Sequence, residues 1–104
     1  MSYADYIEER KCKIVKEVKV IIESEGLNVK RKTSELAHQR FFLMHYLRSN
    51  TKLTLREIGR LFGKKHDMVL YGFRMHTNYT ENKDLLYLDN TKLIREYLET
   101  LKIK

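Results

Sequence analysis

Not one of the 104 residues is proline, and only four are glycine. Proline interrupts helices because its ring clashes with the preceding turn and its nitrogen carries no hydrogen to donate. Without it, helices can form almost anywhere along the chain, and the scarcity of glycine leaves little flexible linker. The length is enough for one small hydrophobic core and too short for two. These features predict an all-α fold in a single helical domain spanning residues 1–104.

Apolar residues recur at helical spacing in about five segments of the chain. The pattern predicts a long N-terminal helix over residues 5–25, which ends at Gly26 because glycine is the usual residue just past a helix. A second helix is predicted over residues 34–48, with Thr33 or Ser34 as its N-terminal cap. The apolar stripe of the first helix could cover the core or join two copies of the chain in a homodimer.

The third helix has the clearest start. Thr54 is followed three residues later by Glu57, which matches a capping box in which each side chain bonds the other's backbone N–H. Gly63 ends this helix, and a fourth begins near His66 after two lysines. Two short helices around a glycine turn predict a helix-turn-helix, whose second helix enters the DNA major groove. Gly59 costs the third helix about 1 kcal/mol relative to alanine, which predicts that another helix packs closely against it.

The C-terminal part is less sharply divided. Residues 78–82 are polar and predict a break after the fourth helix. The last helix ends near Leu101 and begins at about Lys83 or Thr91, because Asp89-Asn90 could interrupt it. Side chains at helical spacing are expected to face the core. They are Ile7, Ile14, Val18, Ile21, Leu36, Ala37, Phe41, Met44, Leu47, Leu55, Ile58, Leu61, Phe62, Val69, Gly72, Phe73, His76, Leu93, Ile94, Tyr97, Leu98 and Leu101.

The positive charge is concentrated in the middle of the chain. Residues 28–76 contain eleven basic and three acidic residues, a net charge of +8, whereas the remainder carries −1. A basic surface attracts polyanions and releases their counterions when it binds them. The same charge would also suit a solvated surface with no partner, so charge alone does not decide between the two.

Residues 30–76 resemble the C-terminal DNA-binding domain (domain IV) of the bacterial replication initiator DnaA. The run 55–63, LREIGRLFG, is similar to the family's pattern of an Ile-Gly pair followed by Phe-Gly, and residues 64–69 are similar to the segment that follows it. Ala37 and Arg40 match the preceding helix without a gap. The resemblance implies a Trp-repressor-like helix-turn-helix core over residues 30–76 that binds double-stranded DNA.

The resemblance also implies roles for single residues. Arg40 would hold a phosphate, Lys65 would match the basic residue before the recognition helix, and His66 would match the histidine that reaches the bases. Lys30-Arg31-Lys32 lies where the family's basic loop enters the minor groove. From the turn and the outward positions of the fourth helix, further contacts are expected. The predicted DNA-binding residues are Lys30, Arg31, Lys32, Arg40, Lys64, Lys65, His66, Asp67, Met68, Tyr71 and Arg74.

The chain departs from the family where bases are read. It is one residue shorter between Gly63 and His66, and Asp67 and Met68 replace two hydroxyl residues. Asp67 could accept a hydrogen bond from a cytosine amino group, or it could cap the recognition helix and read nothing. A different sequence preference is therefore expected. No phosphate-binding loop of an ATPase is present, so we expect the chain not to be an initiator itself.

Other functions find less support in the sequence. The four histidines have no cysteine or carboxylate at ligand spacing, so neither a metal nor another cofactor is expected. No motif of a common catalytic mechanism is present, so no enzymatic activity is predicted. No apolar run is long enough for a membrane span, and the start does not resemble a signal peptide; with the single Cys12, this predicts a cytoplasmic protein. Two hypotheses remain. The first is a regulatory or accessory DNA-binding protein, for which a phage or a mobile element is one possible source. The second is a helical protein–protein interaction module that has kept the DNA-binding fold but binds a protein partner.

Overall fold

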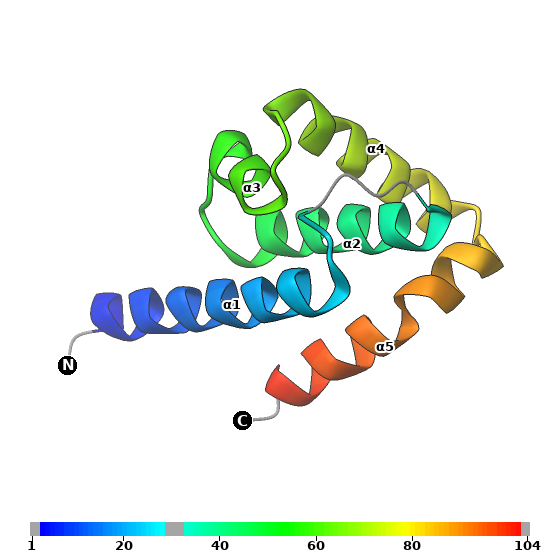
Figure 1. Cartoon of the computed structure of the whole chain (residues 1–104). Coiled ribbons are helices and arrows are strands. Elements are labelled where there is room, and N and C mark those ends of the chain that lie inside the picture. The colour runs from blue at the N-terminus through cyan, green and yellow to red at the C-terminus, as the bar shows by residue number, and fades with distance from the viewer. Residues whose placement is uncertain (1–2, 29–32, 103–104) are drawn as a thin grey trace.

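The computed structural model describes the backbone of residues 3–28 and 33–102 and the side chains of residues 13–28 and 33–100. Over these ranges the chain is all-α, as predicted. The helices are α1 (Tyr3–Glu25), α2 (Ser34–Asn50), α3 (Leu55–Phe62), α4 (His66–Glu81) and α5 (Leu85–Lys102). Figure 1 shows α2 in the middle, with α3 and α4 on one side of it and α1 and α5 on the other.

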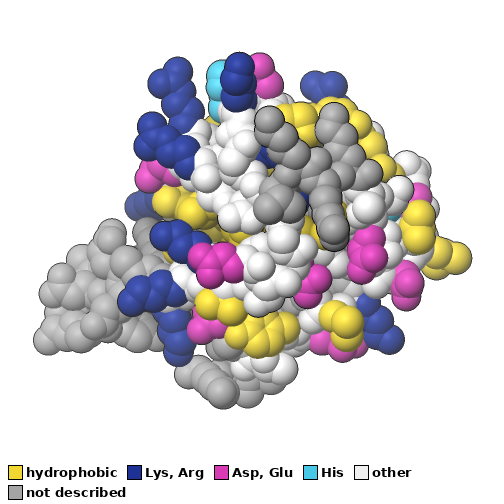
Figure 2. Space-filling view, in the orientation of Figure 1, with side chains coloured by type: hydrophobic (Ala, Val, Ile, Leu, Met, Phe, Trp, Pro, Cys, Tyr) yellow, Lys and Arg dark blue, Asp and Glu magenta, His cyan; other side chains and the backbone are white. Residues whose placement is uncertain are grey.

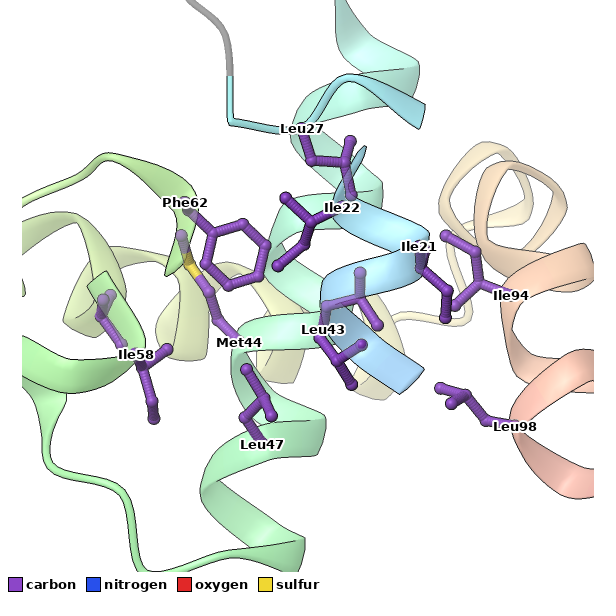
Figure 3. Packing of buried hydrophobic residues seen from close by; sticks show 12 residues of the cluster. Ile21, Ile22, Leu27, Leu43, Met44, Leu47, Ile58, Phe62, Ile94 and Leu98 are labelled. Atoms are coloured by element: carbon purple, nitrogen blue, oxygen red, sulfur yellow. The ribbon is translucent and has the colours of Figure 1, made fainter. Parts of the chain in front are cut away.

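The core forms around α2, which contacts each of the other four helices. Leu43, Met44 and Leu47 of α2 are fully buried. In Figure 3, Ile58 and Phe62 of α3 lie on one side of these residues, and Ile94 and Leu98 of α5 lie on the other. Burying a side chain of this size contributes roughly 1.5–3 kcal/mol, so this cluster is the main force holding the helices together.

The apolar stripe of α1 packs inside the chain where its side chains are described, and Ile7 lies outside the described side chains. Val18, Ile21 and Ile22 are buried against the core, as predicted. Gly26 has a φ of +67°, and the N–H of Leu27 reaches back to the carbonyl of Ile22 at 2.9 Å. This closes the helix and turns Leu27 into the core, where it is fully buried. These residues cover the core rather than join two copies of the chain.

The boundary between α4 and α5 differs from the prediction. α4 continues through the polar residues 78–81 and ends at Glu81. Tyr79 packs against the rings of Tyr87 and His38, at 4.8 and 4.9 Å between ring centroids, and this packing favours the extra helical turn. Lys83 takes a left-handed φ of +51° at the break. Asp84 then accepts a hydrogen bond from the backbone N–H of Tyr87 at 2.9 Å and so caps the start of α5.

α5 is one helix, which Asp89-Asn90 does not interrupt. Its buried face consists of Tyr87, Thr91, Ile94 and Leu98, at spacings of four, three and four residues. The prediction that Leu93 and Tyr97 face the core is wrong: they are 79% and 42% exposed. The apolar residues of α5 form two stripes, and only tertiary packing selects the one that is buried. Leu101 falls outside the described side chains.

Polar contacts attach α5 to the rest of the core. The amide of Asn90 donates to Nδ1 of His38 at 3.0 Å, and Gln39 of α2 donates to the carbonyl oxygen of Asn90 at 3.3 Å. Nδ1 of His76 is hydrogen-bonded to the hydroxyl of Tyr87 at 2.5 Å. His76 is thus partly buried between α4 and α5, close to its predicted place in the core.

Three histidines gather at this junction. His76 stacks on His45, with 4.0 Å between ring centroids. Burial, together with the neighbouring His45, lowers the pKa of His76 to about 4. Burial also lowers the pKa of His38 and of His45. Burial therefore disfavours the protonated form of all three rings, which suits an apolar and aromatic surrounding.

Candidate nucleic-acid interface

The helix-turn-helix is built by local hydrogen bonds around α3. Thr54 and Glu57 form the predicted capping box: the Thr54 N–H donates to the Glu57 carboxylate at 3.0 Å, and the Glu57 N–H donates to the Thr54 hydroxyl at 3.2 Å. At the other end, Gly63 has a φ of +66°. The N–H of Lys64 reaches back to the carbonyl of Gly59 at 2.8 Å. This left-handed glycine turn points the chain into α4.

Gly59 is needed for a different reason than the sequence suggested. A Cβ atom at this position would lie 2.5 Å from the carbonyl oxygen of Lys64, so the turn, and not another helix, occupies the space beside it. The close approach of two helices occurs instead at Gly72 of α4. There a Cβ atom would lie 2.8 Å from the sulfur of Met44 and 3.2 Å from the Phe41 ring on α2. Gly59 thus fixes the turn, and Gly72 fixes α4 against α2.

This packing leaves one side of α4 facing solvent. Val69 and Gly72 are buried against the core, whereas the residues predicted to read DNA lie on the exposed side. The exposed members of this surface are Lys65, His66, Asp67, Met68, Tyr71 and Arg74, with Lys64 half-buried in the turn. Leu70, which is not among the predicted residues, is exposed beside them and belongs to the same surface.

The charge distribution on the surface follows the same division. Figure 2 shows Lys and Arg side chains over α3 and the start of α4, with further ones over α1, whereas most of the Asp and Glu side chains in this view lie over the lower part of the molecule. Arg56, Arg60 and Lys65 are exposed in this region. A basic rim beside an exposed recognition helix is the arrangement that binds a phosphate backbone while side chains reach into the groove.

Asp67 does not cap α4. Lys65 is the N-cap residue and makes no capping hydrogen bond with its side chain. The carboxylate of Asp67 instead lies 2.9 Å from Nε2 of His66, and both side chains are solvent-exposed. Two of the predicted polar readers are therefore engaged with one another in the first turn. The negative charge of Asp67 near the start of the helix also interacts favourably with the helix dipole.

Arg40 lies inside the protein and not on the basic rim. Its side chain is 5% exposed, and its Nε donates to the carbonyl oxygen of Leu27 at 2.7 Å. Burial lowers the pKa of this guanidinium without discharging it. Arg40 thus joins α2 to the turn that follows α1. Its predicted contact with a phosphate stays a prediction, and the basic loop Lys30-Arg31-Lys32 lies outside the described residues.

The described part of the chain holds no group of three His, Cys, Asp or Glu side chains arranged for a metal ion. Among the described residues, no helix combines the length and apolarity that a membrane span requires. A family model described as "Bacterial dnaA protein helix-turn-helix" matches residues 13–75, well over half of the chain. No curated protein and no solved structure gives a significant match. The matched segment contains α2, α3, most of α4 and the second half of α1.

Proposed function

Because the chain belongs to the bacterial DnaA helix-turn-helix family, we propose that it binds double-stranded DNA through α4 as a regulatory or accessory factor. The observation that carries this proposal is the exposed side of α4, which begins directly after the basic turn Lys64-Lys65. The left-handed turn at Gly63 and the close packing of Gly72 on Met44 and Phe41 of α2 set the position of α4 against the core. A rigidly presented helix with cations at its start can insert into the major groove while the lysines contact the backbone.

The contacts divide into two classes by position. Lys64, Lys65 and the exposed arginines of α3 would contact phosphates, which position the protein and carry no direct sequence information. His66, Met68, Tyr71 and Arg74 would face base edges. Because Asp67 is paired with His66, the hydrogen-bonding capacity of the first turn is reduced compared with two free polar side chains.

The proposal is tested by measuring affinity for duplex DNA over a range of salt concentrations. If about five cationic side chains touch phosphates, log K falls with log[salt] at a slope of about −4 to −5. Lys65→Ala should make that slope about one unit shallower. Lys92→Ala is the matched control, because Lys92 is an equally exposed lysine on α5, away from the helix-turn-helix.

Failure to bind any duplex at low salt would contradict the proposal and favour the protein–protein interaction hypothesis. One observation supports that second hypothesis: Leu85, Leu86 and Leu93 of α5 are exposed, at 81%, 57% and 79%. Exposed leucines gathered on one helix are unusual for a surface without a partner. Screening the chain for binding to other proteins is then the next experiment.

A further inference from the structure

The exposed surface of the recognition helix contains more apolar area than base reading by hydrogen bonds requires. Met68, Leu70 and Tyr71 are 38%, 47% and 45% exposed. Asp67 and Arg74 are seven residues apart and so lie on the same face of α4. Leu70 and Tyr71 follow Asp67 by three and four residues, which places one on each side of the line that joins Asp67 to Arg74. These apolar side chains therefore flank the centre of the face that would enter the groove.

Tyr71 is held in place from behind. Its ring meets the ring of Phe41 edge to face, at 5.6 Å between centroids and an interplanar angle of 78°. Phe41 is itself buried in α2. Met68 lines a hollow of about 330 Å³ together with Phe41 and Lys64. The Tyr71 ring, which the buried Phe41 supports, is therefore preorganised for contact.

The polar side chains in the first turn of α4 have fewer free hydrogen-bonding groups than their number suggests. One oxygen of the Asp67 carboxylate lies 2.9 Å from Nε2 of His66. This contact engages one ring nitrogen and one carboxylate oxygen, so fewer polar groups are free to bond a base edge. Direct contact between the first two turns of α4 and the bases thus depends largely on the three apolar side chains.

We propose that Met68, Leu70 and Tyr71 determine sequence preference by packing against the 5-methyl groups of pyrimidines in the major groove. This inference rests on the proposed DNA binding through α4. The C5-methyl of thymine is the one apolar group that unmodified base pairs display there. The preferred sites are therefore expected to carry thymines opposite the first two turns of α4. A 5-methylcytosine presents the same methyl group and is the second source of this chemistry.

The test begins by selecting bound duplexes from a random DNA pool. Each thymine of a selected duplex is then replaced by uracil, which removes the methyl group and keeps the base pair. Affinity should fall about fourfold for each contacted methyl, the effect of burying one such group. The salt slope should stay unchanged, because no phosphate contact is altered. Replacing a contacted thymine by cytosine or by 5-methylcytosine, each paired with guanine, distinguishes the two sources: tighter binding of the 5-methylcytosine duplex shows that a methyl on either pyrimidine is read, and equal affinity restricts the reading to thymine.

Protein variants link the effect to these side chains. Leu70→Ala should lose part of the discrimination between thymine and uracil, and Tyr71→Ala should lose it as well, whereas Tyr71→Phe should keep it because the ring remains. Leu93→Ala, which removes an exposed leucine of α5, is the matched control and should change nothing. Because Tyr71→Ala also removes a contact with Phe41, its circular dichroism is compared with that of the wild type, and Leu70→Ala provides the independent measurement.

Three outcomes would overturn the inference, and the measurements distinguish them. Steep salt dependence with equal affinity for thymine and uracil duplexes would leave DNA binding intact and exclude methyl reading. Discrimination that survives in Leu70→Ala and Tyr71→Ala would assign it to other residues. Absence of binding to any duplex would remove the proposed function and the inference together.

Discussion

The guanidinium of Arg40 donates a hydrogen bond to the carbonyl oxygen of Leu27, at 2.7 Å between Nε and oxygen. The two residues are thirteen positions apart and belong to α2 and to the turn after α1. Both are buried. A basic residue that the family resemblance assigns to phosphate binding thus also fastens two parts of the core.

Arg40→Ala should lower the free energy of unfolding by about 1–3 kcal/mol, because it leaves a buried carbonyl without this donor. Since the side chain is 5% exposed, the salt slope of DNA binding should stay unchanged under conditions where the variant is folded. Lys65→Ala should show the opposite pattern, with unchanged stability and a shallower slope. Urea unfolding and a salt titration measure the two quantities. A slope one unit shallower for Arg40→Ala would establish the phosphate contact that the family resemblance implies.

Gly59→Ala should destabilise the protein, although alanine is the better helix former by about 1 kcal/mol. The added Cβ would meet the Lys64 backbone carbonyl at 2.5 Å, and backbone cannot move aside without opening the turn. Overpacking of this kind costs roughly 1–3 kcal/mol. Gly72→Ala is the comparison: its closest contact is the Met44 side chain, which can rotate, so its cost should be smaller. Equal unfolding midpoints for the wild type and Gly59→Ala would show that the turn can relax.

Lys83→Gly should stabilise the chain by about 1 kcal/mol. Lys83 has a φ of +51°, a left-handed conformation that costs a residue with a Cβ roughly 1–2 kcal/mol. Glycine adopts it freely, although its greater freedom in the unfolded state removes part of the gain. Thermal unfolding should shift upward by several degrees. Lys92→Gly, within α5, should shift it downward, and a shift of the same sign in both variants would contradict this explanation.

Stability should fall as the pH decreases from about 6.5 toward 4. Burial and the neighbouring His45 lower the pKa of His76 to about 4 from its ordinary value of 6.5. Between these values the unfolded chain binds the proton and the folded chain does not, so acid favours unfolding; below pH 4 both states are protonated and the loss levels off. Partial burial limits the effect to about 1–2 kcal/mol, because water screens the charge.

Urea midpoints at pH 7, 5.5 and 4.5 measure this loss. His76→Gln removes the titrating ring and keeps a side chain able to hydrogen-bond Tyr87, so its midpoints should vary less with pH. His66→Gln is the control, because His66 lies on the exposed side of α4, outside the cluster of buried histidines. A pH dependence that is unchanged in His76→Gln would assign it to other groups.

The elements predicted most accurately from the sequence are those whose ends are determined by neighbouring residues. Thr54 and Glu57 specify the start of α3 by their own hydrogen bonds, and Gly63 specifies its end by a backbone conformation that other residues avoid. Both predictions need only neighbouring residues, and both are confirmed. The start of α4 at His66 follows from the same turn.

The predictions that failed depend on contacts between distant residues. The end of α4 was placed too early because the packing of Tyr79 on His38 and Tyr87 is invisible to a local pattern. On α5, Leu93 and Ile94 are adjacent apolar residues, and only the position of α2 decides that Ile94 is the buried one. At the interface, the burial of Arg40 and the pairing of His66 with Asp67 could not be derived from residue type alone.

The central position of α2 has a consequence for the order in which the chain folds. α1 and α3 adjoin α2 in the sequence and pack on it, whereas α5 is attached through Asn90 to residues 51 and 52 positions earlier. Contacts between near neighbours form fastest, because they close short loops. We therefore expect α1, α2 and α3 to form the folding nucleus and α5 to dock late. Substituting Leu43 should then slow folding, whereas substituting Asn90 should mainly speed unfolding.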